Sequence, residues 1–192
     1  MNTLEQKMND AIWIAKELFD RGKATGSSAN LSFLHDGHIY ITGSGTSFGN
    51  LTTESFSEVS FQGQHLAGIK PSKELPLHKL YYEKSEEIQA VIHVNSFYAT
   101  IFSFLDHPDK TDIVPDYTPY LKMKVGTIGI VPYAKTGSNE LFGYFEKAAP
   151  FSDAFILAHH GPVVGGTSLM ETFFGLEELE ESCKIAWTFQ HT

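Results

Sequence analysis

Residues 90–96 read AVIHVNS, and this short stretch decides how the chain is interpreted. Its apolar start is typical of a buried strand, and the apolar run is far too short to span a membrane. Successive side chains of a strand point to opposite faces, so His93 and Asn95 are predicted to face the same way. The stretch therefore predicts a buried strand that ends in two polar groups on one face.

Helical and strand-like patterns alternate on either side of this stretch. Helices are predicted over residues 4–19, 75–83, 97–105 and 139–148, and in a last segment capped by Ser168. Strands are predicted over residues 30–34, 38–42, 90–94, 126–132, 154–158 and 162–164. The Asp36-Gly37 pair predicts a hairpin turn, and residues 107–119 a proline-containing loop. We find no repeat or linker and expect one α/β domain over residues 1–192.

Composition excludes several classes of protein. The 192 residues are 42% apolar and 19% charged, which is a globular balance. The net charge of −9 argues against non-specific binding to nucleic acid or to an anionic membrane, both of which need excess positive charge. Cys183 is the only cysteine, which rules out an internal disulfide and fits a reducing compartment. With an N-terminus unlike a signal peptide, the chain is expected to be cytoplasmic.

Two groups of residues are expected to be structural. The run Glu177, Glu178, Glu180 and Glu181 lies largely opposite the apolar stripe of the last helix and is expected to face solvent. Phe97, Phe102 and Phe104 are expected in the core.

One set of side chains has the composition of a metal site. Glu74, His93, Asn95 and His160 offer two imidazoles, a carboxylate and an amide oxygen, which suit Zn²⁺ or a neighbouring divalent ion. His78 lies one helical turn from Glu74 and is an alternative ligand. Scattered core or surface histidines are the structural alternative, because nine histidines in one chain produce some near-pairs by chance.

Three turns rich in glycine, serine and threonine offer groups that suit phosphate oxygens, at residues 26–30, 44–46 and 71–73. Lys73 could add a positive charge there. The same composition is common in ordinary turns, so both interpretations stay open. Residues 45–49, GTSFG, match the pattern of a serine-hydrolase nucleophile, but no long helix is predicted after them, which disfavours that class.

Five motifs, in order along the chain, resemble the class II aldolase/adducin family. They are SANLS at 28–32, ITGSG at 41–45, KPSKE at 70–74, AVIHVNS at 90–96 and HHG at 159–161. Within the family, residues 117–126, 131–133 and 160–164 are most similar to 3-oxo-tetronate 4-phosphate decarboxylases. Lys73 points the same way, because sugar-phosphate aldolases tend to have Ser-Ser-Glu where this chain has Ser-Lys-Glu.

The resemblance implies a three-layer α/β/α sandwich with a largely antiparallel sheet, assembled as a homotetramer with sites at subunit contacts. It implies one divalent metal per subunit on His93 and His160, with Glu74 as the acid/base residue that also reaches the metal. Tyr120 falls where aldolases of the family present a tyrosine from the neighbouring subunit. The implied phosphate-binding residues are Asn30, Ser44, Gly45, Ser72 and Lys73.

The chain departs from the family pattern at two positions. Asn95 replaces the second histidine of the strand motif, and an amide oxygen is a weaker donor to zinc than imidazole, so Mn²⁺ or another ion could be preferred. Ala29 replaces a glycine, which could restrict the turn beside the phosphate.

The family resemblance, together with the candidate metal and phosphate sites, predicts a metal-dependent carbon–carbon lyase acting on a small phosphorylated sugar acid. The expected reaction decarboxylates a 3-oxo-tetronate 4-phosphate to dihydroxyacetone phosphate through an enediolate. Glu74 would protonate the enediolate carbon if partial burial raises its pKa. The alternatives are a sugar-phosphate aldolase of the fuculose- or ribulose-phosphate type and a non-catalytic adducin-like scaffold.

Overall fold

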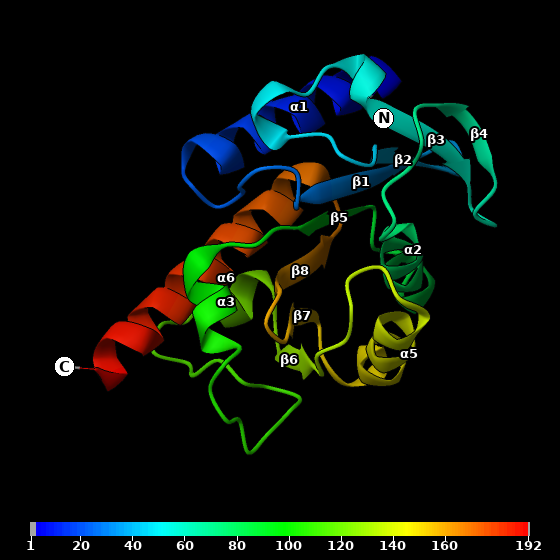
Figure 1. The fold of residues 1–192 in the computed structure, drawn as a ribbon. Helices are drawn as coiled ribbons and strands as arrows, with labels where there is room; N and C mark the ends of the chain where they lie inside the picture. Colours follow the sequence, from blue (N-terminus) through cyan, green and yellow to red (C-terminus); the bar gives the residue numbers. More distant parts are fainter. Residues whose placement is uncertain (1–2, 192) are drawn as a thin grey trace.

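A computed structural model describes residues 3–191 as one eight-stranded sheet with helices on both faces (Figure 1). The strand order is β4-β3-β2-β1-β5-β8-β7-β6, and all neighbours are antiparallel except the parallel pair β6–β7. The strands are β1 (Asn30–His35), β2 (His38–Thr42), β3 (Phe56–Ser60), β4 (His65–Gly68), β5 (Ala90–His93), β6 (Ile128–Val131), β7 (Ala154–Leu157) and β8 (Gly161–Gly166). This arrangement confirms the predicted α/β sandwich with a largely antiparallel sheet.

The helices form the two outer layers. They are α1 (Leu4–Asp20), α2 (Leu75–Lys84), α3 (Phe97–Phe102), α4 (Tyr120–Lys124), α5 (Asn139–Ala148) and α6 (Leu169–Gln190). Buried side chains of α1, α3, α4 and α6 pack in one hydrophobic cluster, and those of α2 and α5 pack in a second. Among the described residues, no helix is long and apolar enough to cross a membrane.

The hairpin and most helices lie where the sequence predicts them, but two strands and one helix were missed. The strands β3 and β4 extend the sheet beyond β2, and every residue of β4 is exposed. An exposed edge strand buries no face, so it lacks the apolar alternation by which strands are recognised. The helix α4 has five residues, too few for a periodic pattern. Phe97 and Phe104 were wrongly assigned to the core, since they are exposed while Phe102 is buried.

Glu180 corrects the prediction of a solvated acidic face on α6. Its side chain is buried against the start of α3 and accepts hydrogen bonds from the Ser96 hydroxyl at 2.6 Å and from the N–H groups of Tyr98 and Ala99 at 2.9 Å. These N–H groups have no partner inside the helix, and a carboxylate also favours the positive end of its dipole. Glu180 therefore anchors the segment that directly follows β5 and carries Asn95.

We predict that Glu180→Ala lowers the free energy of unfolding by about 3 kcal/mol, because it leaves buried donors without an acceptor. Denaturant unfolding followed by circular dichroism measures the change. Glu181→Ala is the matched control, since Glu181 is an exposed neighbour whose ion pair with Lys184 is worth about 0–1 kcal/mol. Equal losses in the two variants would contradict the anchoring role of Glu180.

Candidate metal centre

The register of the sheet places the first groups of the site. Asn30 at the start of β1 pairs with His93 at the end of β5, and His93 pairs with Val163 on β8. Directly paired residues of adjacent strands share a face, so Asn30 and His93 lie side by side. Glu74 lies at the residue before α2, and His160 lies in the turn between β7 and β8.

Three of the predicted ligands converge. His93 Nε2 lies 3.1 Å from His160 Nε2. Glu74 Oε2 is 3.5 Å from His93 Nε2, and Glu74 Oε1 is 3.6 Å from His160 Nε2. One ligand atom from each residue lies within 4.8 Å of the others, which is the composition and spacing of a possible Glu/His/His metal site.

The donor set fits a divalent cation. The Nδ1–H of His93 donates to the Pro162 carbonyl at 2.8 Å, which leaves the Nε2 lone pair directed at the other two groups. Histidines that bind metals commonly donate their second ring nitrogen to a carbonyl in this way. Glu74 Oε1 is a buried acceptor without a hydrogen-bond partner, which an ion would satisfy.

Charge and burial set the protonation of the cluster. Burial, with the neighbouring His93 ring, lowers the pKa of His160 to about 4, so its imidazole is neutral at pH 7. Burial acts to raise the pKa of Glu74, but the His93 and His160 rings and a hydrogen bond from Asn30 together outweigh it. The net shift is downward, so the expectation of a raised pKa for Glu74 is wrong and this carboxyl group is ionised.

Asn95 and His78 have other partners in the structure. Asn95 is half-buried in the same cleft, where its Nδ2 donates to Thr25 Oγ1 at 2.7 Å and its Oδ1 accepts from Thr25 N–H at 3.3 Å. The two ring nitrogens of His78 bond to Ser32 at 2.7 Å and to Asn30 at 2.5 Å. His78, the alternative ligand, therefore lies outside the Glu/His/His cluster.

A cleft of about 820 Å³ opens over this cluster. Its lining includes Glu74, Asn95 and His160 and all five residues predicted to bind phosphate, which are Asn30, Ser44, Gly45, Ser72 and Lys73. Loop residues 25–29 form one wall of the cleft. Tyr120 is not among the lining residues of this chain and is 57% exposed on α4. Ser47, the serine of the serine-hydrolase pattern, is not among the lining residues of the cleft either. Its hydroxyl accepts a hydrogen bond from Gly49 N–H in a short turn.

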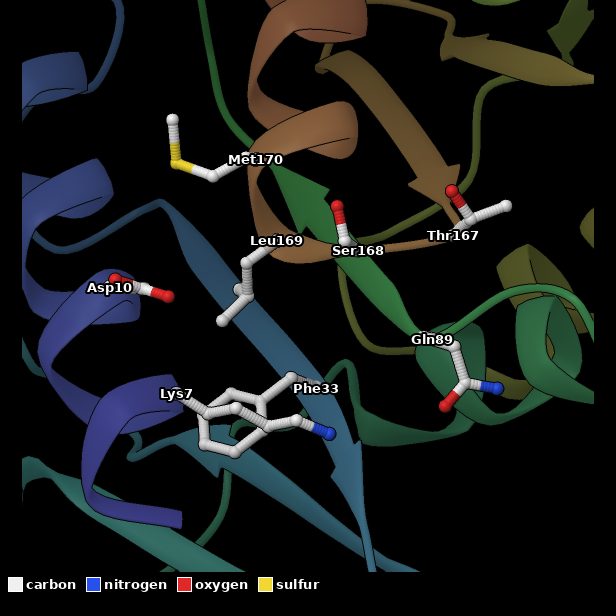
Figure 2. A pocket seen from close by; sticks show the side chains of 8 residues that line it. All are labelled: Lys7, Asp10, Phe33, Gln89, Thr167, Ser168, Leu169 and Met170. Atoms are coloured by element: carbon white, nitrogen blue, oxygen red, sulfur yellow. The ribbon is translucent and has the colours of Figure 1, made fainter. Parts of the chain in front are cut away.

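Figure 2 shows a second cavity, of about 270 Å³, that lies between α1 and the start of α6. Lys7 and Asp10 of α1 lie on one side of it, with Phe33, Leu169 and Met170 nearby. No member of the Glu/His/His cluster lines it. Of these two cavities, the larger cleft therefore holds the convergent chemistry.

The close approach of two backbone segments brings His160 to His93. Gly161 has φ +146°, and a Cβ at this position would lie 2.2 Å from the Val94 carbonyl oxygen and 3.0 Å from Asn95 Cα. Only glycine lets the turn after His160 lie against the end of β5 at this distance. The sequence alone predicts no packing role for Gly161, because the contact joins segments far apart in the sequence.

Comparison with known proteins identifies the family. The model of the class II aldolase and adducin N-terminal domain matches residues 9–187. The chain belongs to the class II aldolase/adducin family. Among relatives of this family, it is 39% identical to the 3-oxo-tetronate 4-phosphate decarboxylase of Escherichia coli strain K12, over 95% of this chain and 87% of the relative. It is 35% identical to an L-fuculose phosphate aldolase of Methanococcus maripaludis, over 93% and 94% respectively.

Solved structures of the class II aldolase fold agree with this assignment. YgbL from Klebsiella pneumoniae, described with aldolase, epimerase and decarboxylase as candidate activities, superposes with a TM-score of 0.93 at 38% identity. The match covers 98% of this chain and 91% of YgbL. An L-fuculose 1-phosphate aldolase has a TM-score of 0.88 at 27% identity, with 100% of this chain and 89% of the aldolase covered.

We predict that Gly161→Ala costs about 2 kcal/mol or more of folding free energy, because the added methyl group meets backbone and the residue must keep a strained φ. The variant should also lose zinc affinity, since relief of the clash moves His160 away from His93. Calorimetric zinc titration and denaturant unfolding measure the two effects. Gly143→Ala is the control. It lies in α5 with open space around it, and it should stabilise the protein by about 0.5–1 kcal/mol.

Proposed function

We propose that this chain is a metal-dependent lyase that decarboxylates a 3-oxo-tetronate 4-phosphate to dihydroxyacetone phosphate. The observation that carries the proposal is the convergence of Glu74, His93 and His160 beneath a cleft. The turns predicted to bind phosphate line that cleft. The relatives support a class II sugar-phosphate lyase over a scaffold, since both named groups are enzymes. The decarboxylases are favoured over the aldolases by 39% against 35% identity.

The metal in this proposal is Zn²⁺ held by Glu74, His93 and His160, with Asn95 Oδ1 as a fourth group. Asn95 lies two residues after His93, just beyond the end of β5, and lines the cleft, which supports its inclusion. When bound, the ion supplies Lewis-acid stabilisation of negative charge on the substrate oxygens.

The turns of the cleft bind the phosphate in this proposal. Ser44, Gly45 and Lys73 are exposed to the cleft and offer a hydroxyl, backbone N–H groups and a cation. Ser72 is buried beside them, and its hydroxyl also accepts a hydrogen bond from Glu74 N–H at 3.3 Å. The amide of Asn30 uses one hydrogen on Glu74 and has a second for the substrate.

Glu74 is the acid/base residue that delivers a proton to C2 in this proposal. Loss of carbon dioxide breaks the C1–C2 bond of the substrate and leaves its electron pair as an enediolate, which needs a proton at C2. Because Glu74 is ionised, it must first gain that proton, and the substrate's C2 hydroxyl can supply it. Oε1, the oxygen without a hydrogen-bond partner, carries the proton in this proposal while it is not bound to the ion. The resulting alkoxide then takes a proton from solvent, which completes dihydroxyacetone phosphate.

We further propose a homotetramer in which Tyr120 acts at the neighbour's site. Tyr120 and Met123 are 57% and 75% exposed on the short helix α4. Large apolar side chains exposed together favour a protein contact at this surface.

Release of carbon dioxide and dihydroxyacetone phosphate from 3-oxo-tetronate 4-phosphates tests the reaction. We expect wild type with zinc to release both products in equal amounts. Glu74→Gln, which keeps the shape of the side chain but cannot carry the proton, should lower kcat by about 10²–10⁴-fold. Lys79→Gln is the control, since Lys79 is half-buried on the same helix and does not line the cleft. Cleavage of L-fuculose 1-phosphate without decarboxylation would assign the aldolase activity instead.

The role of Asn95 is tested by zinc titration at a pH where the free imidazoles are neutral. Asn95→His should tighten zinc binding, about tenfold, because imidazole is the stronger donor to zinc. Asn95→Ala should weaken it. Thr25→Ala is the matched control, since it removes the hydroxyl that Asn95 contacts and leaves all four proposed ligands in place. Equal weakening in Asn95→Ala and Thr25→Ala would show that Asn95 only holds the loop.

A further inference from the structure

A chain of five buried side chains runs beneath the floor of the cleft. The Tyr82 hydroxyl lies 2.6 Å from Ser32 Oγ, which lies 2.7 Å from His78 Nδ1. His78 Nε2 lies 2.5 Å from Asn30 Oδ1, and Asn30 Nδ2 donates to Glu74 Oε2 at 2.8 Å. Each of the five residues is at most 5% exposed. This series of hydrogen bonds therefore links Tyr82, in the protein interior, to the Glu74 carboxylate of the metal cluster.

Two elements interleave to form this chain. Glu74, His78 and Tyr82 are spaced four residues apart, so they lie in one row along α2. Asn30 and Ser32 are two residues apart on β1 and share a face of the sheet. The helix row contributes the first, third and fifth members of the chain, and the strand pair contributes the two members between them.

Every hydrogen bond in the chain has one possible direction. The Asn30 amide donates from Nδ2 to Glu74 Oε2, so the atom that faces His78 is its carbonyl oxygen Oδ1, which only accepts. His78 Nε2 must then carry the ring proton, and its Nδ1 must accept from the Ser32 hydroxyl.

Ser32 in turn accepts from Tyr82, the last donor of the chain. Burial raises the pKa of Tyr82, which keeps its hydroxyl protonated. Burial and the nearby His93 lower the pKa of His78 to about 3, which keeps its ring neutral, as the directions require.

We propose that Tyr82, Ser32, His78 and Asn30 form a one-way hydrogen-bond relay that fixes the Glu74 carboxylate with Oε2 bound and Oε1 free. His78 and Asn30 are thereby positioning residues of the site. The inference rests on the role of Glu74 in the proposed function. The inference assigns His78 a function at the site, although His78 itself binds neither metal nor substrate in this proposal.

Two substitutions of His78 test the relay against a merely structural role. His78→Leu removes both ring nitrogens, whereas His78→Gln can donate to Asn30 from the place of Nε2. We expect His78→Leu to weaken zinc binding at least about tenfold in the absence of substrate, as loss of a group that orients a ligand commonly does. It should also lower kcat with little change in KM. His78→Gln should recover most of both losses.

Tyr81→Phe is the matched control. Tyr81 is adjacent to Tyr82 on α2 and equally buried, but its hydroxyl donates to the backbone carbonyls of Asp153 and Val163. It should lose stability and keep the zinc affinity and kcat of wild type. The relay is wrong if His78→Leu has the same zinc affinity and kcat as Tyr81→Phe. It is also wrong if His78→Gln recovers neither zinc affinity nor kcat.

Wild type provides a test that needs no substitution. Long-range ¹⁵N–¹H spectra of the imidazole should show His78 with its proton on Nε2 alone, and a proton on Nδ1 would overturn the relay. This readout and the zinc titration do not depend on turnover. Failure to decarboxylate any 3-oxo-tetronate 4-phosphate would therefore refute the proposed substrate and leave the relay to be judged on its own result.

Discussion

The hydrogen bond from His93 Nδ1 to the Pro162 carbonyl holds the two halves of the site together. It joins the end of β5 to the start of β8, and it directs His93 Nε2 toward His160 and Glu74. The bond depends on the pairing of β5 with β8, because that register places His93 beside Val163. The pairing in turn needs Gly161 against Val94. The geometry of the cluster is thus set by backbone contacts rather than by long, flexible side chains, which favours a preorganised site.

Burial acts in opposite ways on the ionisable groups of this region. It lowers the pKa values of His78 and His160, so both rings stay neutral and keep the lone pairs they need. Glu74 is equally buried, yet it remains ionised because the rings and the Asn30 amide stabilise its charge. An uncompensated carboxylate at this depth would be costly, so the relay serves folding as well as position. The same contacts that make the site stable also leave Glu74 Oε1 without a hydrogen-bond partner.

Much of this arrangement could be predicted from the sequence because its signals are local. The apolar run 90–93 predicted the strand β5 with His93 at its end, and Asp36 and Gly37, both with positive φ, form the predicted hairpin turn. The remaining features join distant segments. Glu180 looks like part of a solvated acidic run until the start of α3 is seen to lie against it. The relay was missed for the same reason. Its two rows, on β1 and α2, are visible separately in the sequence, but only the packing of the helix on the sheet interleaves them.

The cluster of Glu74, His93 and His160 does not by itself select a reaction. Decarboxylation and aldol cleavage both leave an enediolate, and the same carboxylate can serve either one. Selection must come from groups that contact the part of the substrate that departs. Lys73 packs against the loop at Gly137, where a Cβ would lie 2.9 Å from its side chain, and its charge reaches His160. In a chain of net charge −9, a cation held at the rim of the cleft favours a substrate with a second anionic group. In the proposed function Lys73 faces the phosphate, and its charge also attracts the carboxylate that a sugar acid phosphate carries and a sugar phosphate lacks, which supports the decarboxylase substrate.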